Sequence, residues 1–310
     1  MSKPDWKVEF MQKILEEVVE ENRPLAKRGR VASYIPALAK ADPNHLGICI
    51  VDVNGDIYKI GDADVKFTIQ SISKVISLML ALIDNGEKVF EKVGREGTED
   101  PFNTLYKLDF PHIEKPVNPM INAGAIATTA QIKGDKFGRI LELIRRITGN
   151  ADIDYSREVY LSEKATGEKN RAIAHLMKAR GIIEEDPEEI LDHYFKQCSI
   201  EVTACDLAKI AVFIANGCSG LESYGKIDRK TLSRNLLAIM TIGGMYNVSG
   251  QYAAQVGVPS KSGVGGGIMA AVPGRMGIGV FSPPLDENGN SIAGCAIMKS
   301  LSDRLDLSIF

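Results

Sequence analysis

The sequence predicts a mixed α/β fold of the α+β type: an antiparallel sheet formed by N- and C-terminal segments and flanked by helices, together with a mainly helical lobe. Three observations carry this prediction. A hairpin pattern occupies residues 46–59, apolar residues at helical spacing dominate residues 76–243, and short Gly-rich β-like runs follow Gly243. Because an isolated hairpin is only marginally stable, we expect the early and late strands to pair in one sheet.

The N-terminal elements follow from local patterns. Apolar side chains at helical spacing predict a helix over residues 6–21, which ends in a loop over residues 22–32. The runs GICIVDV and DIYKI predict two strands, and the Asn54-Gly55 pair between them predicts a tight type I′ turn, since these residues tolerate positive φ. A short strand is expected at residues 65–70.

Helices are predicted through the middle of the chain and strands at its end. An apolar helix covers residues 75–83 and ends near Gly86. Further helices are expected at residues 137–148, 170–180, after Asp186-Pro187, and at 203–215, where Thr203 and Asp206 resemble a capping box. The runs GGGIMAAV and RMGIGVFS then predict strands, followed by a final amphipathic segment.

No repeat or low-complexity linker divides the chain, so residues 1–310 are expected to form one domain. Within it, the sheet lobe would comprise about residues 25–75 and 244–310, and the helical lobe about residues 76–243. A chain of 310 residues with 45% apolar residues can bury a core of this size.

Composition argues for a small-molecule substrate in a reducing compartment. A net charge of −3 and a pI near 5.9 provide no broad basic surface for nucleic acid. The five cysteines are scattered and odd in number, which favours free thiols over a disulfide framework. No segment reaches the roughly 20 apolar residues of a membrane span, and the charged N-terminal segment does not resemble a signal peptide. We therefore expect a cytoplasmic protein without membrane partners.

Ser71 and Lys74 form an S-x-x-K motif at the start of the apolar helix. The spacing places the lysine one turn beyond the serine on the same helix face, where the two could share a proton. A helix N-terminus also favours negative charge at the serine. Alone the motif is weak, because a helix cap followed by a surface lysine would give the same letters.

A second motif strengthens the first. Lys261-Ser262-Gly263 stands at the entry to the late strands, and the pair S-x-x-K and K-[ST]-G is typical of serine acyltransferases of the penicillin-binding and β-lactamase type. Another S-x-x-K, at residues 223–226, lies in a Gly-containing loop and is interpreted as a chance match. No G-x-S-x-G and no phosphate-binding G-x-x-x-x-G-K-[ST] occurs.

Metal chemistry has little support in the sequence. The four histidines are far apart and lack ligand spacing: His45, His112, His175 and His193. We expect no metal site and no cofactor.

Several ordered sequence blocks carry a family resemblance over nearly the whole chain. They are Tyr34-Ile35-Pro36, Gln70-Ser71 with Lys74, NPMINAGAI at 118–126, Ser162-Glu163 with Asn170-Arg171, Tyr194 before Gln197-Cys198-Ser199, GGMY at 243–246 and KSGVGGG at 261–267. Together these blocks resemble the β-lactamase-related glutaminases. The only S-x-N, at residues 233–235, falls in a predicted helix and looks accidental, whereas Tyr246 precedes K-S-G.

The resemblance implies an amidohydrolase that converts L-glutamine to L-glutamate and ammonia. Ser71 would attack the side-chain amide, with Lys74 as base and the N–H groups of Ser71 and Val264 holding the oxyanion. Tyr246, together with Tyr34, would relay protons. Whether Lys74 or Tyr246 is the effective base stays open at this stage.

The resemblance also implies the substrate contacts and the assembly. Glu163 would bind the α-ammonium group of the amino acid, and Asn122, Asn170 and Tyr194 would supply neutral donors. Without the resemblance, these four residues would be interpreted as turn, helix-end and core positions. The family resemblance further implies a homotetramer.

Two alternatives remain. A penicillin-binding protein, β-lactamase or esterase could use the same serine and lysine, and would hydrolyse a β-lactam or an ester rather than glutamine. A non-catalytic amino-acid-binding protein would bind glutamine without turnover.

Overall fold

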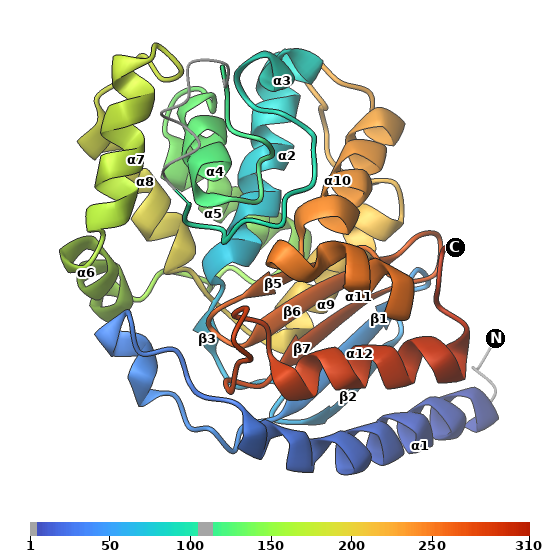
Figure 1. Ribbon diagram of the computed structural model, residues 1–310. Helices are drawn as coiled ribbons and strands as arrows, with labels where there is room; N and C mark the ends of the chain where they lie inside the picture. Colours follow the sequence, from blue (N-terminus) through green and yellow to red (C-terminus); the bar gives the residue numbers. More distant parts are fainter. Residues whose placement is uncertain (1–4, 105–113) are drawn as a thin grey trace.

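The predicted fold class is confirmed by a computed structural model that describes residues 5–104 and 114–310. A five-stranded antiparallel sheet has the order β2-β1-β7-β6-β5, so the early hairpin and the late strands form one sheet (Figure 1). Its strands are β1 (Gly47–Asp52), β2 (Ile57–Gly61), β5 (Ser260–Gly263), β6 (Gly267–Val272) and β7 (Met276–Phe281). A separate pair joins β3 (Phe67–Thr68) to β4 (Glu201–Val202).

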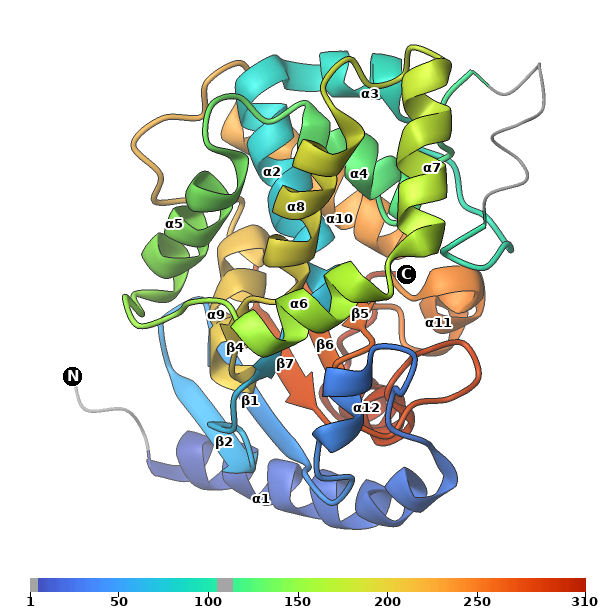
Figure 2. The same ribbon diagram turned by 90° about the vertical axis from the view of Figure 1, so that its left-hand side faces the viewer.

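Helices cover both faces of the large sheet. The terminal helices α1 (Asp5–Asn22) and α12 (Ile292–Leu305) lie together on one face, and α9 (Ala204–Ala215) lies on the other (Figures 1 and 2). Strand β1 is buried on both sides because its alternate side chains enter different cores. Ile48 and Ile50 join the core under α1 and α12, whereas Cys49 and Val51 join the core under α9.

Two glycines in β7 allow α9 to approach the sheet closely. A Cβ atom added at Gly277 would lie 2.1 Å from the backbone nitrogen of Val212, and one at Gly279 would lie 1.9 Å from the carbonyl oxygen of Ala204. No side chain fits at these distances, so glycine is required at both positions.

The middle of the chain is helical, as the sequence predicts. Its helices are α2 (Ser73–Asn85), α3 (Val89–Lys92), α4 (Asn122–Ala130), α5 (Lys136–Thr148), α6 (Arg157–Ala165), α7 (Glu168–Ala179), α8 (Pro187–Cys198) and α10 (Arg229–Gly243), followed by α11 (Ser249–Gln255). The expected capping box is present at the start of α9, where Thr203 and Asp206 exchange side-chain and backbone hydrogen bonds. Gly86 and Gly149 end α2 and α5 with positive φ.

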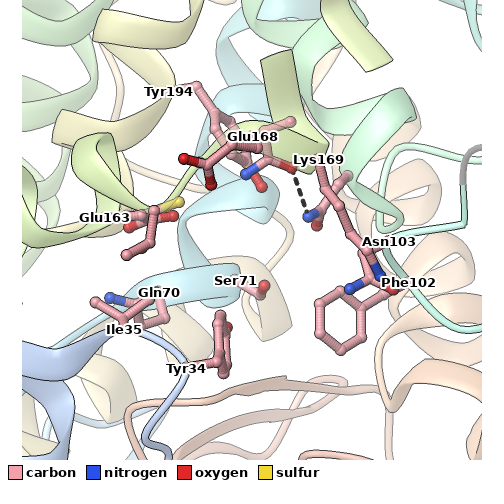
Figure 3. Close-up of a pocket in the computed structure, with 15 residues that line it drawn as sticks. Tyr34, Ile35, Gln70, Ser71, Phe102, Asn103, Glu163, Glu168, Lys169 and Tyr194 are labelled. Carbon is pink, nitrogen blue, oxygen red and sulfur yellow. Dashed lines mark hydrogen bonds between the residues drawn. The ribbon is translucent and has the colours of Figure 1, made fainter. Parts of the chain in front are cut away.

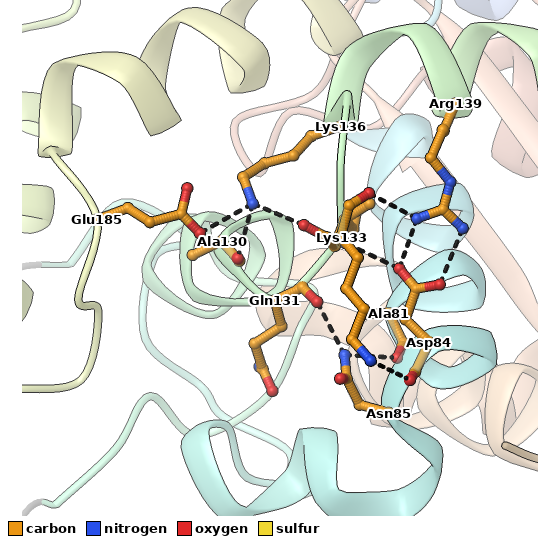
Figure 4. A network of polar contacts seen from close by, with 10 residues as sticks. Ala81, Asp84, Asn85, Ala130, Gln131, Lys133, Lys136, Arg139 and Glu185 are labelled. Atoms are coloured by element: carbon orange, nitrogen blue, oxygen red, sulfur yellow. Dashed lines mark hydrogen bonds and ion pairs between the residues drawn. The ribbon is translucent and has the colours of Figure 1, made fainter.

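A polar network joins the ends of α2, α4 and α5 (Figure 4). Asp84 accepts two hydrogen bonds from the guanidinium group of Arg139, at 2.7 and 2.8 Å. The buried ammonium group of Lys136 donates to the carbonyl oxygens of Ala130 and Ile132 and pairs with Glu185 at 2.9 Å. These bonds satisfy one carbonyl group at the end of α4 and one just beyond it, and they fix the position of that helix, which carries Asn122 at its start.

The early hairpin is present, but its predicted turn type is wrong. Only Gly55 has a positive φ, of 87°, whereas a type I′ turn needs positive φ at Asn54 as well. The Asp52 carboxylate accepts hydrogen bonds from the backbone N–H groups of Asn54 and Asp56, at 2.9 and 3.0 Å. The Asp52 side chain thereby caps a loop that is wider than the predicted two-residue turn.

Other local predictions have clear outcomes. The short strand expected at residues 65–70 is reduced to β3, and the final amphipathic segment forms α12. The second S-x-x-K lies in a loop and the S-x-N lies within α10, as expected for chance matches. The division into two lobes stays a prediction, since α9 comes from the helical block and packs on the sheet.

Among the described residues, no helix is long and apolar enough to cross a membrane. Nor do the described parts of the chain bring together three or more His, Cys, Asp or Glu side chains that could hold a metal ion. His112 lies outside the described residues.

Candidate active site

Ser71 lies in a strained turn between β3 and α2. A 3₁₀ turn spans Gln70–Ile72, and α2 begins at Ser73, so the serine precedes the α-helix instead of opening it. Gln70 has φ of 49°, which non-glycine residues rarely adopt. The hydroxyl of Ser73 donates to the carbonyl oxygen of Gln70 at 2.8 Å and holds this conformation. The turn therefore presents Ser71 at a fixed orientation beside the sheet edge.

Lys74 is fully buried beneath this turn. Its ammonium group donates to Oδ1 of Asn122 at 2.7 Å and to the carbonyl oxygen of Met120 at 3.1 Å. Neither acceptor carries a full charge, and the electrostatic effects of Cys198 and Glu163 only partly offset the loss of water around the cation. Burial consequently lowers the pKa of Lys74 to about 8, so about a tenth of the lysine is neutral at pH 7 and about half at pH 8.

Tyr246 is a buried neighbour of Ser71. Its backbone has φ of 56°, and its hydroxyl donates to the carbonyl oxygen of Ser262 at 3.2 Å. Burial raises the pKa of Tyr246, although a hydrogen bond with the Ser71 side chain acts in the opposite direction. The phenol is therefore protonated at neutral pH and touches the serine hydroxyl.

The K-S-G segment forms the edge strand β5, next to the serine turn. Lys261 is fully buried, its ammonium group 4.3 Å from the ring centroid of Tyr246, and it donates to the carbonyl oxygens of Gly244 and Ser262 at 2.9 and 2.6 Å. Burial, and to a lesser extent the charge of Lys74, holds the pKa of Lys261 well below its usual range. Lys261 thus fixes the ring of Tyr246 and the start of the following loop.

A pocket of about 160 Å³ opens above Ser71, a size that suits a small molecule (Figure 3). Its walls come from segments far apart in the sequence. They consist of Tyr34, Ile35, Gln70, Ser71, Phe102, Asn103, Asn122, Glu163, Thr166, Gly167, Glu168, Lys169, Asn170, Tyr194 and Cys198.

Glu163 is the most unusual side chain in this pocket. It is 7% exposed, and its Oε2 atom has no hydrogen-bond partner. Burial raises the pKa of Glu163 to about 8, and the attraction of Lys74 only partly opposes this effect. A buried carboxylate without a partner is costly, so the arrangement favours a cationic group in the pocket.

Neutral polar groups face the same space. Nδ2 of Asn122 donates to Oδ1 of Asn170 at 3.0 Å, which links the start of α4 to α7. Since Oδ1 of Asn122 accepts from Lys74, one asparagine connects the lysine to the pocket wall. Tyr194 is buried beside Cys198, and burial raises its pKa well above the usual range.

The structure brings the site residues expected from the sequence to one place. Ser71, Asn122, Glu163, Asn170, Tyr194 and Tyr34 line the pocket. Tyr246 contacts the Ser71 side chain, and Lys74 donates to Asn122 of the pocket wall. Tyr34 is 57% exposed and stands at the pocket mouth. Val264 lines an adjoining cavity that shares Tyr34 and Phe102 with the pocket. Within the described chain, the Val264 N–H makes no backbone hydrogen bond.

Sequence reasoning missed part of the wall. Phe102 contacts Tyr246 with ring centroids 4.9 Å apart and lies 6.0 Å from the Lys74 ammonium group, yet no periodic pattern surrounds it. Glu168 and Lys169 also line the pocket, and their position directly before the expected site residue Asn170 could have identified them from the sequence. Cys198 lies in one of the sequence blocks that carry the family resemblance, but the sequence did not indicate that it lines the pocket.

Comparison with known proteins decides the family. The sequence profile of the glutaminase family matches residues 29–310. The chain belongs to the glutaminase family. It is 52% identical to glutaminase 2 of Clostridium perfringens over 307 residues, which cover 97% of this chain and all of that protein. It is 54% identical to the glutaminase of Clostridium tetani, again over 97% of this chain and all of that protein.

Solved structures agree with the family. A probable glutaminase of Bacillus subtilis, solved in complex with 6-diazo-5-oxo-L-norleucine, is 37% identical with a TM-score of 0.84, and the match covers 96% of each chain. The fold is therefore the β-lactamase-like fold of glutaminases, and the chain is an enzyme of the amidohydrolase class that acts on linear amides.

Proposed function

We propose that the enzyme hydrolyses L-glutamine to L-glutamate and ammonia through an acyl-enzyme on Ser71. The observation that carries the proposal is the buried, unpaired carboxylate of Glu163 in the same small pocket as Ser71. A free amino acid supplies the ammonium group that this carboxylate lacks. Its side-chain amide then extends toward the serine.

Substrate recognition would depend on groups that are costly to leave unpaired. Glu163 binds the α-ammonium group, and Asn122, Asn170 and Tyr194 donate to the α-carboxylate and the amide. The solved relative with 6-diazo-5-oxo-L-norleucine supports an amino-acid site, because that compound is an amino acid with a reactive ketone near the end of its side chain. Another relative was solved in its glutamate form.

The lowered pKa supports Lys74 as the base in this proposal. Its lowered pKa provides a neutral amine near pH 8, whereas Tyr246 keeps its proton. Lys74 therefore accepts the serine proton, and the Tyr246 hydroxyl, which already contacts Ser71, passes a proton to the leaving nitrogen. Tyr34 at the pocket mouth assists this transfer.

Acylation forms one bond to the substrate and breaks one. The Ser71 oxygen bonds to the amide carbon, the carbon–nitrogen bond breaks, and ammonia leaves with the transferred proton. The N–H groups of Ser71 and Val264 stabilise the oxyanion of the intermediate. Water then attacks the γ-glutamyl ester, with proton transfer in the reverse direction, and L-glutamate leaves while Ser71 regains its proton.

The test is ammonia release from L-glutamine by the wild-type chain and by Ser71→Ala, with L-asparagine and a chromogenic β-lactam in parallel. Ser223→Ala is the matched control, because Ser223 belongs to the second S-x-x-K, is exposed in a loop and does not line the pocket. The proposal expects glutamine turnover that Ser71→Ala abolishes. Faster β-lactam hydrolysis, or binding of glutamine without turnover, would replace it with one of the two alternatives.

We also propose a homotetramer in the cytoplasm. The proposed compartment follows from five scattered cysteines, which stay free in a reducing environment. Light scattering coupled to size-exclusion chromatography tests the assembly, and a monomer or dimer at micromolar concentration would refute it.

A further inference from the structure

Two cysteines outside the pocket meet where α9 crosses the sheet. Cys49 lies in β1, and its side chain belongs to the buried core under α9. Cys205 lies in the first turn of α9 and packs against the same core. Neither residue lines the pocket of Ser71.

The packing of α9 brings these two positions close together. Cys49 pairs across the sheet with Gly279 of β7. The space above Gly279 is occupied by Ala204, whose carbonyl oxygen would lie 1.9 Å from an added Cβ. Ala204 also donates its N–H to the carbonyl oxygen of Ala63 at 3.1 Å. The residue after Ala204 is therefore held directly over the strand that contains Cys49.

The surroundings make the two thiols chemically different. Cys205 is partly exposed, and its thiol donates to the Asp64 carboxylate at 3.7 Å. Lys59, which pairs with Cys49 across the hairpin, forms an ion pair with Asp64. The close contact with Cys49 lowers the pKa of Cys205, as does the charge of Lys59, although burial and Asp64 oppose them.

Cys49 is the less acidic partner. Its thiol is fully buried, and both the contact with Cys205 and burial raise its pKa. A helix N-terminus also favours the thiolate at Cys205. Cys205 is thus the exposed sulfur that reacts first, and Cys49 is the sulfur placed to react second.

We propose that Cys49 and Cys205 form an oxidisable dithiol, a modification site that hydrogen peroxide converts to a disulfide linking β1 to α9. The Cys205 sulfur attacks peroxide, the O–O bond breaks, and sulfenic acid and water form. The Cys49 sulfur then attacks that sulfur, an S–S bond forms, and a second water leaves. Two thiols lose two electrons in total, and one peroxide gains them.

The experiment treats the folded full-length chain with hydrogen peroxide, blocks free thiols, and measures intact mass before non-reducing peptide mapping. The expected result is the loss of two hydrogen atoms per chain and a peptide pair joined through Cys49 and Cys205. Cys205→Ser and Cys49→Ala should each abolish this loss. Cys295→Ser is the matched control, because Cys295 is also partly exposed but burial raises its pKa to about 12.

Every other product contradicts the proposal. Oxygen addition at Cys205 without a linked peptide would show that Cys49 cannot reach it, and a bond that includes Cys198 or Cys295 would assign the reactivity elsewhere. If the folded chain keeps all five free thiols under hydrogen peroxide while the denatured chain loses them, the proposal is also overturned. Because the readout is mass, the result is independent of glutaminase activity.

Discussion

Replacing Glu163 with glutamine should stabilise the folded protein while it damages the substrate site. Burial raises the pKa of this carboxyl from 4.5 to about 8, so the folded state holds its proton more tightly than the unfolded state. The stability that this group contributes is present in full below pH 4.5 and is lost as pH rises to 8. Glutamine does not titrate, and it therefore suffers no such loss.

The size of the effect follows from the two pKa values. At about 1.4 kcal/mol per pH unit, the wild-type chain loses at most about 3 kcal/mol by pH 7 and about 5 kcal/mol above pH 8. The free energy of unfolding of the Glu163→Gln chain should therefore exceed that of wild type by an amount that grows between pH 5 and 8. Its KM for glutamine should rise at least about 100-fold, because the α-ammonium group loses its charged partner.

Urea denaturation of both chains at pH 5, 7 and 9, at equal protein concentration and without substrate, measures the free energy of unfolding. Glu168→Gln is the matched control: it removes an exposed carboxylate from the same pocket and should change stability by no more than about 0.5 kcal/mol at any pH. If Glu163→Gln is no more stable than wild type at pH 9, or if the difference does not grow with pH, the buried-carboxylate reasoning is refuted.

Three further predictions concern the base, the phenol and the sheet. Since Lys74 must be neutral to act and its pKa is about 8, kcat at saturating glutamine should rise by about tenfold per pH unit below pH 8 and level off above it; a flat kcat profile from pH 6 to 8 in steady-state assays would exclude Lys74 as base. Tyr246→Phe should lower kcat by about 10²–10⁴-fold with little change in the KM measured alongside it, whereas a near-normal kcat would remove the phenol from proton transfer. Gly279→Ala should lower the free energy of unfolding by about 1–3 kcal/mol, because the new Cβ meets the carbonyl of Ala204; Gly250→Ala, an exposed position where an added Cβ meets nothing and φ is not positive, is the control that should cause no such loss.

The sequence predicts the chemistry of the site better than its local geometry. Ser71, Lys74 and K-S-G were identifiable as a candidate site because their spacing matches two motifs of serine acyltransferases, and the sheet followed from strand patterns at the two ends of the chain. The strained turn at Gln70 was not predictable, because a side-chain contact from Ser73 holds it. The Asn54-Gly55 turn differs from its usual type because Asp52 provides a competing cap.

The pocket residues that the sequence did not predict also depend on contacts made only in the tertiary fold. Phe102 lies in an irregular segment, and only the tertiary fold brings its ring against Tyr246. Likewise, the free oxygen of Glu163 and the neutral hydrogen-bond acceptors of Lys74 depend on the tertiary fold. These features tune the pKa values, and no pattern along the chain encodes them directly.

The most direct test of the Ser71 acyl-enzyme is to locate the covalent label left by 6-diazo-5-oxo-L-norleucine, because the pocket wall contains a second nucleophile, the thiol of Cys198. Peptide mass spectrometry of the inactivated enzyme should place the label on Ser71, with labelling and loss of ammonia release advancing together. A label on Cys198, or full inactivation with Ser71 unmodified, would contradict the account.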